Sequence, residues 1–178
     1  MNESEVSLRL ASAADATCLS ALATHVFFET YATSGIRLAL AREAEAHFST
    51  AAFTQRLGEP SSRALLAELS GHLIAFAALT LGAGHALVPP SRSAELTRLY
   101  VQSPFIRRGV GCQLLRRAET LASKEGASTL WLTAWVGNTR ALAFYASQGY
   151  EPLGSTEYTF EGEAFENRLF AKALRAET

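Results

Sequence analysis

The sequence predicts a single α/β domain that spans residues 1–178, and three observations lead to this fold class. Stretches with apolar residues at helical spacing alternate along the chain with short, apolar, strand-like runs. Glycine or proline follows several of these stretches, where a helix or strand would end. No repeat, linker or low-complexity tract divides the chain. The expected order is one strand, three helices, three strands, a helix, a strand, a helix and two final strands.

The first half of the chain predicts a strand, three helices and a hairpin. Apolar residues of the first helix recur at helical spacing, and Ser12 and Asp15 are alternative caps for it. Gly58 ends the third helix, and Ser70–Gly71 is the turn between the hairpin strands. In order, these elements are strand 5–10, helices 13–31, 34–49 and 50–57, and strands 63–69 and 72–82.

The second half begins with a loop, residues 82–93, and continues with alternating strands and helices. Gly126 occupies the position of a helix C-cap, and Gly149 stops the last helix. The run STLWLTAW is nearly continuous in apolar residues, which is typical of a strand buried on both faces. The elements are strand 94–101, a helix from Val110, strand 128–135, a helix from Asn138, and strands 151–160 and 164–174.

Composition excludes several classes of function. The 178 residues include 16 basic and 17 acidic side chains, and a net charge of −1 argues against nucleic acid or anionic membrane as a partner. The longest apolar run, Leu73–Leu79, is far shorter than the roughly 20 residues of a membrane span. The N-terminus lacks the basic region of a signal peptide, so we expect a cytoplasmic protein. Its two cysteines, Cys18 and Cys112, are then expected to be free thiols.

Metal and hydrolase chemistry are not indicated either. The four histidines show no metal-ligand spacing, and neither cysteine has a nearby partner, so we expect no metal site. No Gly-x-Ser-x-Gly segment occurs, and this argues against a serine hydrolase.

The segment RRGVGC, residues 107–112, follows a predicted strand and opens a helix, and we call it the glycine segment. A Walker-type phosphate loop needs a lysine and a hydroxyl after its second glycine, but Cys112 and Gln113 follow here. A dinucleotide fingerprint needs a third glycine, where this chain has Leu114. A third interpretation remains, in which backbone N–H groups and the dipole of the helix bind an anion. The alternative is a solvated basic helix face behind a tight turn.

Arginines surround this segment and no acidic residue lies among them, which suits a ligand with several phosphates. They are Arg98, Arg107, Arg108, Arg116 and Arg117.

Two stretches resemble motifs of the GNAT superfamily of acyl-CoA-dependent N-acetyltransferases. ELTRLYVQSPFIRRGVGCQLL, residues 95–115, is similar to its motif A, and LWLTAWVGNTRALAFYASQGYEPLG, residues 130–154, is similar to its motif B. The segments VFFETYA and GSTEYTFEGEAFENRLFAKAL resemble the PaiA-like branch, in which polyamine acetylation is known. The resemblance implies a mixed, mostly antiparallel sheet of seven strands with a central splay, flanked by four or five helices.

The resemblance also implies acetyl-CoA as the co-substrate. Its pantetheine would hydrogen-bond to the backbone of strand 94–101, and its pyrophosphate would lie on the glycine segment. The first position of the family's Gln/Arg-x-x-Gly-x-Gly/Ala pattern is Ile106 here, which costs at most one side-chain contact because the loop binds through backbone N–H groups. The cofactor-binding residues implied are Leu99, Tyr100, Val101, Ile106, Arg107, Arg108, Gly109, Val110, Gly111, Cys112, Asn138 and Tyr145.

Acetyl transfer needs a base for the amine and a proton for the leaving thiolate. By resemblance Tyr145 is the proton donor, and it lies seven residues after Asn138, about two helical turns, so both side chains share a face. The alternative is a tyrosine that only fills the core. Some relatives carry a glutamate where this chain has Thr133, which cannot act as a base. By resemblance Glu95 is the candidate base, because it stands four residues before Leu99, as does the catalytic glutamate of the histone-acetylating relatives. On a strand it shares one face with Leu99. The alternative is a carboxylate that only holds the substrate or an arginine.

Acceptor recognition is expected from the first two helices and the last two strands. The candidates are Glu29, Tyr31 and Trp135, together with acidic residues that suit a cationic amine or are ordinary solvated charges. These acidic residues are Glu151, Glu157, Glu161, Glu163 and Glu166. A small primary amine is the expected acceptor, with polyamines as one candidate class. A protein N-terminus or lysine, a non-catalytic acyl-CoA-binding regulatory module, and a homodimer all stay open.

Overall fold

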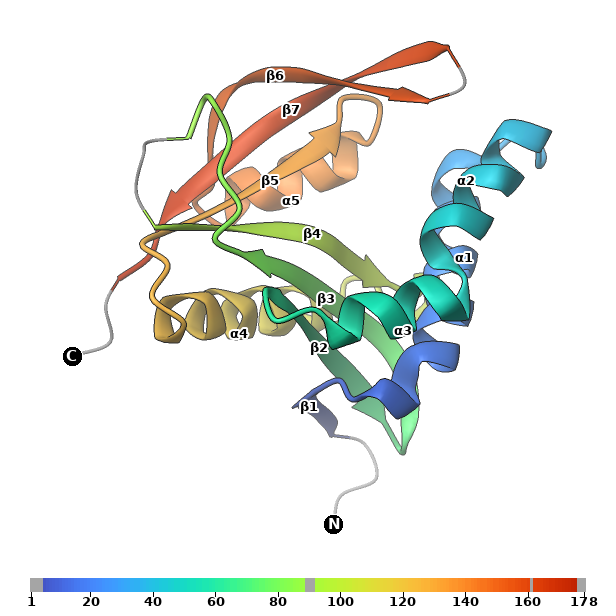
Figure 1. Ribbon diagram of the computed structural model, residues 1–178, viewed down its shortest axis with the longest axis horizontal. Helices are drawn as coiled ribbons and strands as arrows, with labels where there is room; N and C mark the ends of the chain where they lie inside the picture. Colours follow the sequence, from blue (N-terminus) through green and yellow to red (C-terminus); the bar gives the residue numbers. More distant parts are fainter. Residues whose placement is uncertain (1–4, 89–91, 161, 176–178) are drawn as a thin grey trace. The chain divides into compact units, whose positions relative to one another are not determined.

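The structure is a computed structural model that describes residues 5–88, 92–160 and 162–175 (Figure 1). The residues form two compact units. Unit 1 comprises Met1–Ala78 and Arg98–Ala118, and unit 2 comprises Leu79–Thr97 and Glu119–Thr178. The prediction of a single domain over residues 1–178 stays a prediction.

Seven strands form one sheet, as the resemblance implies, and their order is β1-β2-β3-β4-β5-β7-β6. The pairs β1–β2, β5–β7 and β6–β7 are antiparallel, and β4–β5 is parallel. The strands are β1 Val6–Leu10, β2 Ser62–Leu69, β3 His72–Leu81, β4 Ser93–Val101, β5 Thr129–Trp135, β6 Glu151–Phe160 and β7 Glu163–Ala173.

The described residues also form five α-helices and two short 3-10 turns, close to the predicted positions. The α-helices are α1 Ala16–Tyr31, α2 Leu38–Phe48, α3 Thr50–Gly58, α4 Val110–Lys124 and α5 Thr139–Ser147, and the turns are η1 Ala13–Asp15 and η2 Ser103–Phe105. Helix α2 begins four residues later than the sequence pattern predicts. Gly35 has φ +109° and Arg37 is extended, so the backbone cannot be helical before Leu38.

Aromatic side chains join the helices of unit 1 to its strands. The ring centroid of Phe27 on α1 lies 5.2 Å from that of Phe48 on α2. Phe53 on α3 and Tyr100 on β4 both pack edge-on against Phe76 of β3, at 5.9 and 5.6 Å. Such aromatic pairs add to the free energy gained from burial alone. Phe48 also lies 6.1 Å from Tyr100, so the three helices are anchored to the strands through one continuous aromatic layer.

Helix α4 ends as the glycine in the sequence predicts. Gly126 has φ +90°, and its N–H donates to the carbonyl of Ser123, while the N–H of Ala127 donates to Ala122. This pair of bonds is a Schellman motif, in which a left-handed residue satisfies the last carbonyls of a helix.

In unit 2, a small apolar cluster forms around β5 and β7. Trp131, Leu169 and Ala171 pack with Val88 of the loop that precedes β4. The indole N–H of Trp131 donates to the carbonyl of Ala83 at 2.9 Å, which attaches that loop to the sheet.

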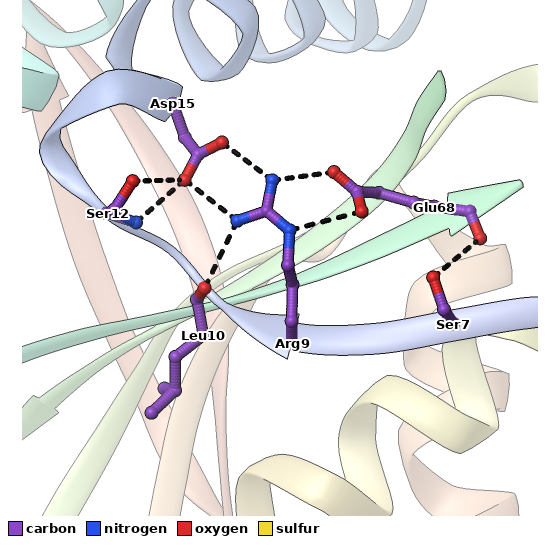
Figure 2. Close-up of polar contacts among 6 residues, drawn as sticks. All are labelled: Ser7, Arg9, Leu10, Ser12, Asp15 and Glu68. Atoms are coloured by element: carbon purple, nitrogen blue, oxygen red, sulfur yellow. Dashed lines mark hydrogen bonds and ion pairs between the residues drawn. The ribbon is translucent and has the colours of Figure 1, made fainter. Parts of the chain in front are cut away.

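A charged network attaches the start of the helical layer to the first strand. The guanidinium of Arg9 on β1 donates to both carboxylate oxygens of Asp15, at 2.7 and 2.9 Å, and to both of Glu68 on β2, at 2.6 and 3.1 Å (Figure 2). Asp15 also accepts from the backbone N–H of Ser12 at 2.7 Å. Ser12 and Asp15, the two alternative caps, thus act together at the turn η1 before α1.

Replacement of the chain's only aspartate tests this network. We expect Asp15→Asn to lower the free energy of unfolding at neutral pH by about 1 kcal/mol, because it removes the charge of the bidentate pair with Arg9 while an asparagine can still cap. The hydrogen bonds from Arg9 hold the pKa of Asp15 well below its ordinary value. Its contribution to stability is therefore present above an unfolded-state pKa of about 3.9 and is lost as the pH falls below that value.

Urea unfolding at neutral pH and at about pH 3 measures the effect, and the deficit of Asp15→Asn should shrink at the lower pH. Glu45→Gln, on the exposed side of α2, is the matched control and should behave like the wild type at both pH values. A deficit of equal size at both pH values would contradict the proposed contribution of the Asp15 charge.

Candidate functional site

The glycine segment lies in a tight connection between β4 and α4 in unit 1. The N–H of Gln102 donates to the carbonyl of Ile74 at 3.1 Å, which attaches the residue after β4 to β3. The chain then makes the 3-10 turn η2, in which Pro104 lies in the first positions, and α4 begins at Val110.

The backbone of this connection is left-handed at two residues. Arg107 has φ +64° and Gly109 has φ +79°. A Cβ at Gly109 would meet only the side-chain amide of Gln113, at 3.9 Å, so the glycine is needed for its backbone angle rather than for space. The carbonyl of Gly109 accepts the first helical bond, from the N–H of Gln113 at 3.0 Å. The N–H groups of the first turn therefore have no carbonyl within the helix to bind.

Four of the five predicted arginines are exposed. Arg107 and Arg108 lie in this connection, and Arg116 and Arg117 lie in the middle of α4. The guanidinium of Arg108 lies 5.5 Å from the ring of Phe105, which holds it beside η2. Arg98 differs, because its guanidinium lies 5.2 Å from the ring of Phe48 in the aromatic layer. The N-terminus of α4 combines a positive helix dipole with Arg107 and Arg108, so it is suited to bind an anion.

The other residues predicted for this connection are half-buried or buried. Ile106, Gly111 and Cys112 are half-buried and Val110 is 2% exposed. Cys112 and the exposed Cys18 are both free thiols, as predicted.

Strand β4 carries the residues predicted to bind through their backbone. Leu99, Tyr100 and Val101 are all half-buried. Tyr100 points into the aromatic layer, where burial raises the pKa of its phenol. Because side chains alternate along a strand, Leu99 and Val101 project from the opposite face.

Glu95 lies where the pairing of β4 with β5 ends. The register pairs Ser93–Glu95 with Thr129–Trp131, and Glu95 is opposite Trp131. Strand β4 continues to Val101 and β5 to Trp135, so the paired stretch is only the first part of each strand. The Glu95 side chain is half-buried.

Asn138 begins α5 in unit 2 and forms its cap. Its side-chain carbonyl accepts from the N–H of Ala141 at 3.1 Å, and its backbone carbonyl accepts from Leu142. The amide NH2 of Asn138 is a donor that this cap does not use. Asn138 therefore acts as an ordinary N-cap, and a second contact of the same side chain stays compatible with this role.

Tyr145, on α5, lies in an aromatic cluster and is 8% exposed. Its ring centroid is 5.3 Å from Phe144, 5.9 Å from Tyr150 and 6.2 Å from Phe170 on β7. Its backbone carbonyl accepts from the N–H of Tyr150 at 3.1 Å. The ring is thus fixed by packing from both α5 and the sheet.

The residues predicted to recognise the acceptor lie in different units. In unit 1, the Glu29 carboxylate on α1 accepts from the hydroxyl of Ser103 at 2.7 Å and lies 3.3 Å from the imidazole of His25. Tyr31 is 37% exposed and packs against Phe27. In unit 2, the half-buried Trp135 packs on its own turn, because a Cβ at Gly137 would lie only 2.4 Å from its ring.

Four of the acidic residues predicted in the last two strands are exposed, namely Glu151, Glu157, Glu163 and Glu166. The fifth, Glu161, lies outside the described residues. Glu157 on β6 is directly opposite Glu166 on β7. The hydroxyl of Ser155 donates to the Glu166 carboxylate at 2.7 Å.

Sequence reasoning missed two polar groupings. One is the contact of Ser103 with Glu29, and the other joins Glu119, Tyr150 and Lys172 in unit 2. Neither has a sequence signal, because the partners are far apart along the chain. In the described part of the chain, no three His, Cys, Asp or Glu side chains gather as a metal site would require, and none of its helices meets the length and apolarity of a membrane span.

Comparisons with known proteins agree with this geometry. An uncharacterised N-acetyltransferase of Mycobacterium tuberculosis is 28% identical over 114 residues, which are 64% of this chain and 69% of that protein. The structure of the PaiA N-acetyltransferase of Thermoplasma acidophilum, in complex with coenzyme A, has a TM-score of 0.76 at 22% identity, and the match covers 95% of this chain and 99% of that one.

A GCN5-related N-acetyltransferase of Rhodopseudomonas palustris has a TM-score of 0.72 at 25% identity and covers 98% of this chain and 99% of its own. The sequence profile of the acetyltransferase (GNAT) family matches residues 28–150, which include both the glycine segment and the helix with Tyr145. The chain therefore belongs to the acetyltransferase (GNAT) family and is an acyltransferase of the N-acetyltransferase class.

Proposed function

We propose that the protein transfers the acetyl group of acetyl-CoA to a primary amine of a small cationic acceptor, with polyamines as the substrate class. The acceptor is inferred from the opposed pair Glu157 and Glu166 on β6 and β7. Like charges at directly opposed strand positions destabilise a sheet. An acceptor with two or more ammonium groups would relieve this repulsion when it binds.

The donor site is proposed on the connection between β4 and α4. Residues 107–112 would bind the pyrophosphate of acetyl-CoA through the N–H groups of the first helical turn, and Arg107 and Arg108 add positive charge there. The left-handed backbone at Arg107 and Gly109 supports this assignment, since it forms a concave turn ahead of the helix. Ile106 replaces a polar family residue without affecting these backbone donors.

The pantetheine is proposed to bind along β4. The short pairing of β4 with β5 supports this, because Leu99, Tyr100 and Val101 lie beyond its last paired residue, Glu95. Their backbone groups would then bond the pantetheine amides as a neighbouring strand would.

The reaction is proposed as direct attack in a ternary complex. An alkyl ammonium has a pKa of about 10.4, so the amine must lose a proton before it attacks. Glu95 would take that proton through water, and the amine nitrogen would then form a bond to the thioester carbon. As the carbon–sulfur bond breaks, the hydroxyl of Tyr145 would donate its proton to the leaving thiolate. The second proton, which the nitrogen loses as it becomes an amide, would then restore the phenol of Tyr145. No covalent enzyme intermediate is formed.

Tyr145→Phe tests the acid. Because only the hydroxyl is removed and the ring stays in its aromatic cluster, we expect kcat to fall by roughly 100-fold, within the range of general acid–base effects. The Kd for coenzyme A, measured by calorimetry, should not change. Wild-type turnover in this variant would remove Tyr145 from the mechanism.

Glu95→Gln tests the base. A general base acts when deprotonated, so kcat/KM falls as the pH drops below its pKa, and a glutamine cannot ionise. We expect a lower kcat and the loss of this low-pH limb, measured against the matched control Glu45→Gln on α2. A pH profile identical to that of the wild type would eliminate Glu95 as the base.

Thiol release from acetyl-CoA, measured with polyamines, aminoglycosides, amino acids and peptides, tests the acceptor. We expect diamines and triamines to be the best substrates. The double variant Glu157→Gln/Glu166→Gln should raise the KM for a triamine by about tenfold, because two exposed charge contacts of roughly 0.7 kcal/mol each are lost. The KM for acetyl-CoA should not change.

Glu151→Gln, on the same strand but opposite Ala171, is the matched control and should leave both KM values unchanged. A peptide as the best acceptor would favour a protein N-terminal or lysine acetyltransferase instead. Binding of acetyl-CoA without turnover on any acceptor would favour a regulatory acyl-CoA-binding module.

A further inference from the structure

Three polar side chains of unit 2 meet next to the aromatic cluster of Tyr145. Glu119 comes from α4, Tyr150 follows α5 and Lys172 comes from β7. The Tyr150 hydroxyl donates to the Glu119 carboxylate at 3.0 Å. The Lys172 ammonium donates to both oxygens of the same carboxylate, at 2.9 and 3.0 Å. We call these three residues the Tyr150 anchor.

The anchor restrains Tyr150 from two directions. Its hydroxyl is fixed by Glu119, and the Lys172 ammonium lies 5.4 Å from its ring centroid, within the range of a cation–π contact. Tyr150 is 2% exposed, and burial together with Glu119 raises the pKa of its phenol, so the hydroxyl keeps its proton. A hydrogen bond to a carboxylate is stronger than one between neutral groups.

Tyr150 in turn contacts Tyr145 through backbone and ring. The N–H of Tyr150 donates to the carbonyl of Tyr145 at 3.1 Å, and that of Gly149 donates to Ala146 at 3.1 Å. With Gly149 at φ +81°, these bonds form a Schellman motif at the end of α5. The two tyrosine rings make the side-chain contact that accompanies this motif, with centroids 5.9 Å apart.

A helix cap alone does not require the hydroxyl of Tyr150. The contact in a Schellman motif is hydrophobic, so a phenylalanine ring would serve it equally well. The hydroxyl, Glu119 and Lys172 add a polar restraint that capping does not use. Its effect is to fix the ring against which the ring of Tyr145 packs.

We propose that the Tyr150 anchor is a positioning device for Tyr145, and that it holds the Tyr145 hydroxyl where it can donate to the leaving thiolate. This inference rests on the proposed role of Tyr145 as the acid. A small displacement of a reacting group lowers the rate by a large factor, because proton transfer requires the donor and the acceptor at hydrogen-bond distance and correctly oriented. Tyr150 itself touches no substrate in this scheme and acts only through Tyr145.

A double-mutant cycle with Tyr150→Phe and Tyr145→Phe tests the proposal. We expect Tyr150→Phe alone to lower kcat by about tenfold, since a misplacement below 1 Å costs less than 100-fold. The KM for acetyl-CoA should stay within twofold of the wild type. In the Tyr145→Phe background, Tyr150→Phe should cause no further loss of kcat, because there is no hydroxyl left to position.

Lys172→Met is a second route to the same result, since it removes the charge that holds Glu119 and keeps an unbranched side chain. We expect a loss of kcat in the same direction and the same absence of effect in the Tyr145→Phe background. Asp15→Asn is the matched control, because it weakens a charged network in unit 1 and should lower stability without lowering kcat.

Three outcomes would overturn the proposal, and they are distinguishable. Wild-type kcat in both Tyr150→Phe and Lys172→Met would show that the anchor has no role in turnover. Equal losses of kcat with and without the Tyr145 hydroxyl would show a general effect on the fold. Full activity of Tyr145→Phe alone would remove the acid of the proposed function, and with it the group to be positioned.

Discussion

Helix α4 connects two parallel strands, and this constraint shapes the surroundings of the glycine segment. Parallel strands cannot be joined by a tight turn and need a crossover, which α4 provides between β4 and β5. Only η2 and residues 106–109 separate β4 from the helix, so the backbone must change direction within a few residues. Left-handed conformations at Arg107 and Gly109 achieve this. The same geometry leaves the N–H groups of the first helical turn available for an anion.

The near-neutral net charge of the chain conceals opposite local charges. Exposed arginines follow the left-handed turn in unit 1, whereas exposed glutamates line the β6–β7 hairpin in unit 2. An anionic acyl donor and a cationic acceptor need opposite electrostatic environments, and a local field can provide each where the average charge of −1 provides neither. Charged groups that take no part in this proposal, such as Arg9 with Asp15 and Glu68, are already paired with one another.

Structural and catalytic interpretations of α5 are compatible with one another. Asn138 caps the helix through its carbonyl oxygen, and this leaves its amide donors for a ligand. Tyr145 packs in a buried aromatic cluster, and that packing is what would hold a proton donor in one orientation. A catalytic group gains from a rigid environment, because less entropy is lost when the substrate arrives. The buried cluster therefore supports the proposed role of Tyr145 as well as the stability of unit 2.

The sequence by itself determined the order of the elements, the strand–turn–helix context of the glycine segment, the cap at Gly126 and the family, because each depends on residues close together in the chain. Helical and strand periodicity, glycines at left-handed positions and capping residues act over a few residues, so they can be read without the fold. Even locally, the periodicity did not predict the late start of α2, because a pattern of residues does not reveal the backbone angle of Gly35.

The tertiary structure alone decided which distant polar residues meet. Ser103 contacts Glu29, Glu157 lies opposite Glu166, and the Tyr150 anchor forms from Glu119, Tyr150 and Lys172. Such contacts join residues that are distant in sequence, and they depend on strand register and on how helices pack, which no local pattern of residues encodes.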